Sequence, residues 1–205
     1  MFERLMGRHR GDGQSDAELS DAELHRAALK GSGEAMAALY RRHGGLVYRF
    51  TLRMSRDEAI AEEVTQEVFL ALLSQLDRFD PEKAALATWL CGIARRQLWK
   101  HLERFDHLTA EDDNALETES LEDSPVTWLI RQEAVAAVRQ GLDELALPLR
   151  EVIVLCELEE MSYEQAAQVL AVPIGTVRSR LHRAKARLAA LMRGSMAGAG
   201  TEKTC

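Results

Sequence analysis

The segment SYEQAAQVLAVPIGTVRSRLHRAKARLAAL (residues 162–191) decides the fold of the C-terminal part of the chain. Its first residue, Ser162, stands three residues before Gln165, which is the spacing of a capping box at a helix start. The pattern predicts a short helix over 163–170 and a tight break at 171–173, followed at once by a longer helix. A short helix, a short turn and a longer basic helix together form the helix-turn-helix pattern.

The longer helix is strongly basic. From 171 to 193 the chain has six Lys or Arg residues and no acidic one, although its net charge over 205 residues is −7. Local segregation of charge, rather than the average, decides whether a surface attracts nucleic acid. The expected DNA-facing residues of this helix are Thr176, Arg178, Ser179, Arg180, His182, Arg183, Lys185 and Arg187.

Position along the helix divides these residues into two groups. The N-terminal part of such a helix lies in the major groove, where arginine reads guanine through paired hydrogen bonds. Residues expected to meet bases are Arg178, Ser179, His182 and Arg183, and those expected to meet phosphate are Arg180, Lys185 and Arg187. A solvated basic face is the alternative interpretation. The capping box, the break and the absence of acid occur together, and this combination favours DNA binding.

Helical periodicity also governs the N-terminal half, and no useful β-alternation appears anywhere in the chain. The expected helices are 21–30, 34–54, a helix that Asp57 caps and Asp80-Pro81 ends, and a helix that Thr88 caps and that runs to about Arg104. Proline disfavours helical geometry in the residue before it, which is why the third helix is expected to end there.

Eight acidic residues and no basic Lys or Arg lie between positions 106 and 123, where periodicity is lost. The predicted fold is therefore all-α, with two small helical domains joined by a flexible acidic linker, and the C-terminal domain a helix-turn-helix. The expected boundaries are a disordered tail at 1–20, a first domain at 21–105, a linker at 106–126, the helix-turn-helix domain at 127–193 and a disordered tail at 194–205.

Four segments of the sequence resemble a known family. LPLREVIVLCELEEMSYEQAAQVLAVPIGTVRSRLHRAKARL (147–188) is similar to the −35-reading domain of extracytoplasmic-function (group 4) sigma factors of bacterial RNA polymerase. ALYRRHGGLVYRF (38–50), EEVTQEVFLAL (62–72) and ATWLCGIARRQLWKHLER (87–104) resemble the core-binding and −10-reading domain of that family, in the same order.

The resemblance implies a cytoplasmic transcription initiation factor whose partners are core RNA polymerase, promoter DNA and an anti-sigma factor. It assigns core-polymerase binding to Glu62, Glu63, Gln66, Glu67 and Phe69. It assigns −10 contacts, in the loop 77–88 and the helix after it, to Arg78, Asp80, Lys83, Trp89, Arg95, Arg96, Gln97, Trp99 and Lys100.

The residues predict no catalytic set, no metal site and no cofactor, so an enzyme is not expected. His101 and His107 lack partners at metal-ligand spacing and are interpreted as lone surface histidines. No apolar run approaches the ~20 residues that span a bilayer, and membrane insertion is not expected. Two other functions stay open: a stand-alone helix-turn-helix regulator that never docks on polymerase, and a helical interaction protein without a DNA function.

Overall fold

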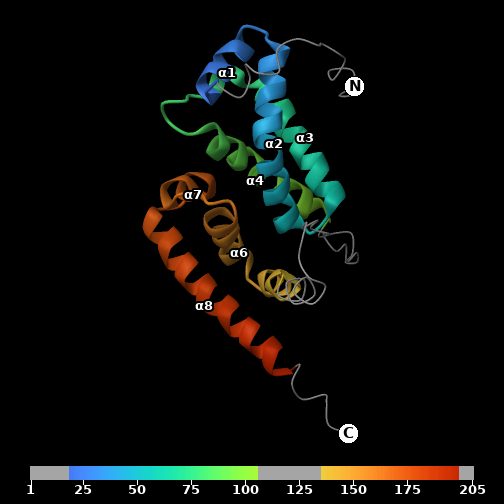
Figure 1. The fold of residues 1–205 in the computed structure, drawn as a ribbon, viewed down its shortest axis with the longest axis vertical. Coiled ribbons are helices and arrows are strands. Elements are labelled where there is room, and N and C mark those ends of the chain that lie inside the picture. The colour runs from blue at the N-terminus through green and yellow to red at the C-terminus, as the bar shows by residue number, and fades with distance from the viewer. Residues whose placement is uncertain (1–18, 106–134, 199–205) are drawn as a thin grey trace, which may run out of the picture. The chain divides into compact units, whose positions relative to one another are not determined.

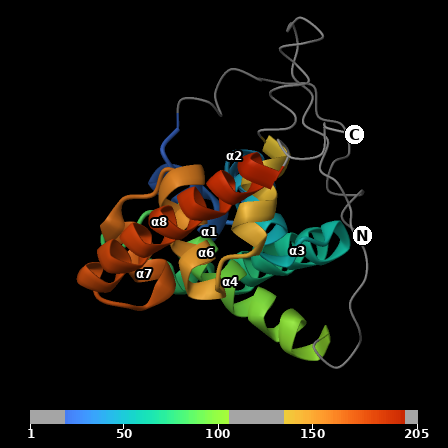
Figure 2. The ribbon, with the colours of Figure 1, turned by 90° about the horizontal axis from the view of Figure 1, so that it is seen from below.

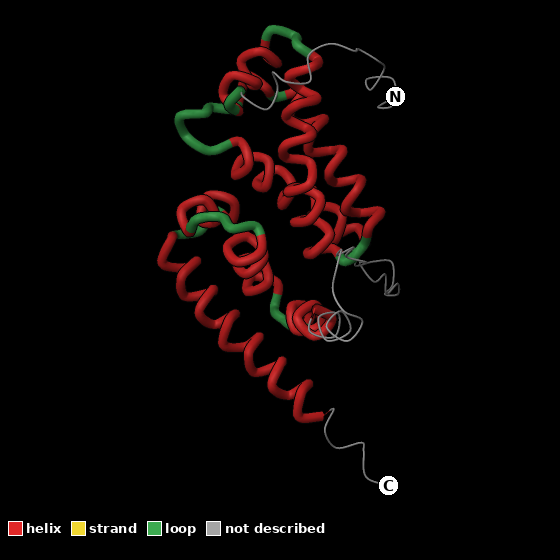
Figure 3. Tube along the Cα trace, in the orientation of Figure 1, coloured by secondary structure: helices red, strands yellow, loops and turns green. Residues whose placement is uncertain are grey.

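The computed structural model describes residues 19–105 and 135–198, so the expected linker lies outside the described residues, as do the expected tails apart from a few residues at their inner ends. The described residues form helices joined by short loops, and no strand occurs among them (Figure 3). This confirms the all-α prediction. The chain divides into two compact units, Met1–Glu111 and Asp112–Cys205. Within the described ranges no helix has the length and apolarity needed to cross a membrane.

The N-terminal unit is centred on its second helix, which packs against three others (Figure 1). Its elements are α1 (Asp21–Leu29), α2 (Gly33–Ser55), α3 (Glu58–Ser74), the 3-10 helix η2 (Leu76–Arg78) and α4 (Leu86–Phe105). Side chains cap the first three helices, because Ser20, Ser32 and Asp57 each accept a hydrogen bond from a backbone N–H in the first turn. The predicted cap at Asp57 is confirmed.

The core of this unit lies between α2, α3 and α4. Phe50 of α2, Leu72 of α3 and Leu90 of α4 are fully buried. Their burial removes large apolar surfaces from water, which is the dominant favourable term in folding. Long-range packing, and not helix propensity alone, therefore holds α3 and α4 side by side.

Two predicted details of helix ends in this unit differ from the structure. The helix expected to run up to the loop at 77–88 ends at Ser74, and the 3-10 helix η2 follows it. There the buried His25 ring donates from Nε2 to the Leu76 carbonyl oxygen at 2.6 Å. Thr88 is not a cap, since α4 already starts at Leu86 and Thr88 is buried inside its first turn.

The C-terminal unit is held together by its long last helix, which packs against the elements before it (Figures 1 and 2). Its elements are a helical stretch at 135–143, α6 (Leu147–Ile153), the π-helical turn η3 (Val154–Leu158), α7 (Tyr163–Leu170) and α8 (Ile174–Gly198). Pro148 lies in the first turn of α6, where a backbone N–H would have no partner within the helix. The π-helical turn η3 follows α6 directly, and α8 continues to Gly198, past the domain boundary expected at 193.

Arg150 joins the first two helical stretches of this unit. Its side chain is buried and donates from Nε to the Leu142 carbonyl at 2.9 Å and from Nη2 to the Asp143 carbonyl at 2.6 Å. These carbonyls belong to the last turn of the 135–143 helix, where no N–H of the same helix reaches them. The buried guanidinium therefore links the end of this helix to α6.

The turn between α7 and α8 is closed by one residue with left-handed backbone geometry. Ala171 has φ 54° and ψ 46°, and its N–H and that of Val172 bond back to the last turn of α7. Non-glycine residues adopt this conformation at a cost, because Cβ approaches the backbone. The helix-turn-helix is thus built around a strained alanine.

Replacing that alanine with glycine relieves this strain. Ala171→Gly is expected to raise the free energy of unfolding of the C-terminal unit by about 0.5–1 kcal/mol, net of the entropy that glycine adds to the unfolded chain. Thermal unfolding monitored by circular dichroism measures the effect, and Ala189→Gly, at an exposed right-handed helical position of α8, is the control that should destabilise. Equal destabilisation by both variants would contradict the role of Ala171.

Asp21 ties the first helix to the second. Its carboxylate accepts from Arg42 at 2.7 Å and pairs with the buried His43 ring at 2.8 Å. Partial burial opposes ionisation, but the hydrogen bonds from Arg42 and His43 outweigh it and hold the pKa of Asp21 below its ordinary value. Because the folded pKa is lowered, this stabilisation is present above the pKa of the unfolded chain and is lost as pH falls through the folded value.

Asp21→Asn is therefore expected to lower the free energy of unfolding by about 1 kcal/mol at pH 7, with the difference from wild type shrinking below about pH 4. Urea unfolding at several pH values measures both quantities. Glu82→Gln removes the same charge from a fully exposed position and serves as the control. If the free energy of unfolding of Asp21→Asn stayed below that of wild type by a constant amount down to pH 2, the interaction of Asp21 would not depend on its charge, and this prediction would be wrong.

Candidate nucleic-acid interface

The orientation of α8 is fixed by the side chains that it buries against α7 and α6. Val177, Leu181 and Ala184 are buried at spacings of four and three residues, while Leu188 and Leu191 are partly buried. Such spacing places them on one side of the helix, so residues between them face outward. Of the predicted DNA-facing residues, Arg178, Ser179, His182, Arg183, Lys185 and Arg187 are exposed, and Thr176 and Arg180 are partly exposed.

Three of these outward side chains are held by neighbours. The Arg178 guanidinium lies over the Tyr163 ring, 5.8 Å from its centroid. Arg183 donates from Nε to the Ser179 carbonyl at 3.3 Å, and Lys185 forms an ion pair of 2.8 Å with Glu157. Within 135–193 no hydrogen bond or ion pair fixes the side chains of Arg180, His182 or Arg187. The face therefore combines positioned and unconstrained cations.

The π-helical turn before α7 brings an acidic side chain to this basic face. Glu157 lies in η3 and reaches Lys185, and their hydrogen bond raises the pKa of the lysine ammonium. Cys156 lies beside the same pair; burial raises the pKa of its thiol and the charge of Glu157 adds to the effect. The thiol is thus kept in its protonated, unreactive form. No pattern in the sequence predicted this turn.

Glu157 competes with phosphate for Lys185. Glu157→Gln is expected to tighten binding to a non-specific DNA duplex by up to about fivefold, the upper value for an exposed ion pair. The plot of log affinity against log salt is expected to become steeper, by up to about 0.9 for one further phosphate contact. Fluorescence polarisation with the full chain measures both, and Glu144→Gln removes the same charge elsewhere in the unit. Equal effects of the two variants would contradict a specific competition.

The predicted −10 residues of α4 are all at least partly exposed. Arg96 and Lys100 are exposed and four residues apart, while Arg95, Gln97 and Trp99 are partly buried. Arg95 lies 5.9 Å from the Trp99 ring centroid, and Lys100 donates to Gln97 Oε1 at 3.1 Å. An aromatic ring with cationic neighbours suits a single strand, whose bases stack on such rings.

The loop before α4 is anchored by an aromatic contact that the sequence reading did not identify. Phe79 is buried and its ring lies 5.5 Å from Trp89 and 4.9 Å from His25. The signal in the sequence is an aromatic residue inside an otherwise polar loop. It fixes Trp89 at the base of the loop and leaves its ring only partly exposed.

Two of the predicted polar residues in this loop pair with each other. Asp80 and Lys83 form an ion pair of 2.9 Å, and Asp80 also accepts from the Glu82 N–H at 3.0 Å. The hydrogen bond from Lys83 lowers the pKa of Asp80, and that from Glu82 adds to it. Arg78 is exposed at the end of η2. The pair shapes the loop, and both members remain accessible.

The predicted polymerase-binding face lies on α3. Glu62, Glu63 and Gln66 are exposed and Glu67 is partly exposed. Phe69 does not belong to this face: it is 1% exposed and packs against Tyr40, with ring centroids 4.7 Å apart. The assignment of Phe69 to polymerase binding is therefore corrected, because this side chain is part of the core of the unit.

Two leucines extend the acidic face toward the end of α3. Leu70 and Leu73 are 52% and 45% exposed. They follow Gln66 at spacings of four and seven residues, so the three share one side of the helix. Exposed leucines beside polar residues are typical of a docking surface. Helical spacing from Gln66 is the signal that identifies them.

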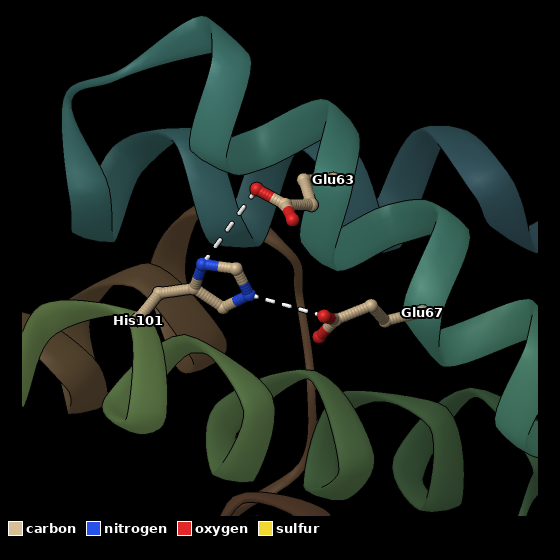
Figure 4. A group of neighbouring side chains, drawn as sticks. All are labelled: Glu63, Glu67 and His101. Carbon is tan, nitrogen blue, oxygen red and sulfur yellow. Dashed lines mark ion pairs between the residues drawn. The ribbon is translucent and has the colours of Figure 1, made fainter. Parts of the chain in front are cut away.

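His101 is a buried residue that bridges α3 and α4, not a lone surface histidine (Figure 4). Its Nε2 lies 3.2 Å from Glu67 and its Nδ1 lies 3.8 Å from Glu63. The three offer ligand atoms within 4.8 Å of one another, a spacing that suits a small cation. However, the carboxylates approach different ring nitrogens, whereas an ion binds only one of them. The arrangement is that of a polar bridge between two helices.

Comparison with known proteins settles the family. Residues 39–106 match Sigma-70 region 2, and residues 136–188 match Sigma-70, region 4. The ECF RNA polymerase sigma factor SigC of Mycobacterium tuberculosis is 33% identical over 188 residues, which cover 86% of this chain and 92% of SigC. The chain belongs to the sigma-70 family.

Other relatives agree with this assignment. The RNA polymerase sigma-H factor of Pseudomonas aeruginosa is 32% identical over 174 residues, which are 80% of this chain and 90% of that protein. The solved structure of CnrH in complex with the cytosolic domain of CnrY superposes with a TM-score of 0.65 at 29% identity, covering 85% of this chain and 97% of CnrH. The prediction of an extracytoplasmic-function sigma factor of RNA polymerase is confirmed.

Proposed function

We propose that this sigma factor contacts the promoter and the polymerase through three separate surfaces. The observation that carries the proposal is the outward face of α8. This helix directly follows the turn of the helix-turn-helix, and its exposed residues include several basic ones and no acidic one. The N-terminal part of α8 enters the major groove of the −35 element. Arg178 and Arg183 read bases, with Ser179 and His182 beside them, and the remaining cations contact phosphate.

The second surface binds the −10 element as a single strand. Trp89, Trp99 and the cations of α4 hold the backbone and stack on bases, and the loop 77–88 receives a base taken out of the duplex. Such a base costs a few kcal/mol to unstack, and binding in the loop offsets this cost. Melting then draws on binding energy and needs no covalent chemistry from this chain. The open access to Arg78, Asp80 and Lys83 supports the assignment.

The third surface docks on core polymerase through α3. Exposed carboxylates at Glu62 and Glu63 suit a basic partner surface, and Leu70 and Leu73 supply apolar area beside them. We place this action in the cytoplasm, where the polymerase works. We also expect an anti-sigma factor to hold the chain inactive, as suggested by the structures of related sigma factors, among them RpoE of Bartonella quintana bound to the anti-sigma factor NepR.

Run-off transcription tests the proposal. The purified chain is mixed with core RNA polymerase and fragmented DNA of the same genome, and discrete transcripts that need the chain are expected. Arg183→Ala is expected to lower their yield by roughly 5- to 150-fold, since one base-reading arginine contributes ~1–3 kcal/mol. Arg193→Ala, exposed near the far end of α8, is the matched control.

The outcomes separate the proposal from its rival. A chain that binds duplex DNA but yields no transcript and no complex with core polymerase would be a stand-alone regulator. Transcripts whose yield is reduced equally by Arg183→Ala and Arg193→Ala would refute the assignment of base reading to the N-terminal part of α8.

A further inference from the structure

Arg178 is an exposed arginine of α8 that contacts an aromatic ring of α7. Its guanidinium lies over the Tyr163 ring at 5.8 Å from the centroid. In the described part of the C-terminal unit no hydrogen bond or ion pair competes for it. A cation over an aromatic face within about 6 Å is attracted by the ring quadrupole. The ring is thus the contact that holds this guanidinium, and the Glu164 carboxylate adds an electrostatic attraction to it.

Tyr163 is itself rigidly placed. It is the first residue of α7, directly after Ser162, whose hydroxyl accepts from the Gln165 N–H at 3.2 Å while Gln165 Oε1 accepts from the Ser162 N–H at 2.9 Å. This reciprocal capping box fixes the start of the helix and hence the position of the Tyr163 backbone. The ring nevertheless remains 38% exposed, although burial would be the usual fate of a large side chain at a helix crossing.

From these contacts we propose that Tyr163 is a positioning residue for base readout, holding Arg178 in the orientation that discriminates one base pair of the −35 element. Bidentate recognition of a base depends on the plane of the guanidinium, and a free arginine must give up side-chain freedom to achieve it. A ring that restricts the guanidinium before binding reduces that loss. Phosphate contact makes no such demand, and Arg180 and Arg187 have no comparable support.

The proposal rests on the proposed function, because it assumes that α8 reads a −35 duplex. It adds a difference in role: Arg178, positioned by Tyr163 of α7, discriminates between bases, whereas the cations that lack such a contact contribute affinity. Loss of the ring should therefore change discrimination at one base pair and leave the salt dependence of binding unaltered.

The experiment uses holoenzyme assembled from the full-length chain and core polymerase, with a promoter mapped by run-off transcription. Binding is measured for every single-base-pair substitution of the upstream element. Arg178→Ala identifies the base pair whose discrimination depends on Arg178. At that pair Tyr163→Leu is expected to reduce discrimination about two- to fivefold, the size of an exposed cation–π contact. Tyr163→Phe, which keeps the ring, is expected to retain it.

Three controls make the result decisive. The double variant Tyr163→Leu/Arg178→Ala should discriminate no worse than Arg178→Ala alone, because both act through one contact. Glu164→Gln removes the neighbouring charge and should leave discrimination unchanged. Circular dichroism and thermal unfolding establish that Tyr163→Leu remains folded.

The contrary outcomes are equally clear. Equal loss in Tyr163→Leu and Tyr163→Phe would assign the effect to the hydroxyl and overturn the proposal. A uniform loss at all base pairs would indicate a merely structural role and overturn it as well. Wild-type holoenzyme without any sequence preference in the upstream element would instead refute the proposed function on which the inference rests.

Discussion

The close crossing of α7 and α8 is the constraint on which the DNA-binding surface depends. Ala166 and Ala167 are buried between these helices, and their small side chains allow a close approach. Ala171 reverses the chain within three residues, so α8 has little freedom to rotate about its axis. With Val177 and Leu181 turned inward, the basic residues between them must face solvent. Packing of small residues, and not the positive charge itself, sets the direction of the basic face.

This dependence explains which parts of the fold were predictable. The capping box at Ser162 and the break before Ile174 are local patterns, and each is confirmed. The errors in the N-terminal unit arise from residues distant in the chain. The His25 ring forms a hydrogen bond with the Leu76 carbonyl oxygen, and Phe69 is buried against Tyr40. A sequence pattern records which faces are apolar, but it does not record which distant side chain meets them.

The same distinction holds for the candidate sites. Periodicity alone predicted the outward residues of α8, because helical geometry determines them. Their partners were not predictable: Glu157 reaches Lys185 through a π-helical turn, and such turns have no simple sequence signature. His101 was missed for a similar reason, since its carboxylate partners lie on another helix. Sequence therefore identifies a surface more readily than it identifies the contacts that tune it.

A common feature of the three surfaces is that the chain provides its own partners for groups that must later meet a ligand. Lys185 is paired with Glu157 on the basic face, Asp80 with Lys83 in the loop, and Glu67 with His101 beside the acidic face. Exposed ion pairs such as the first two are weak, so phosphate can replace them at little cost, whereas the ring of His101 is buried. Such pairs temper affinity without blocking access. Selectivity must then come from groups held by contacts that survive binding, and a neutral aromatic ring beneath an arginine meets that requirement where a carboxylate would not.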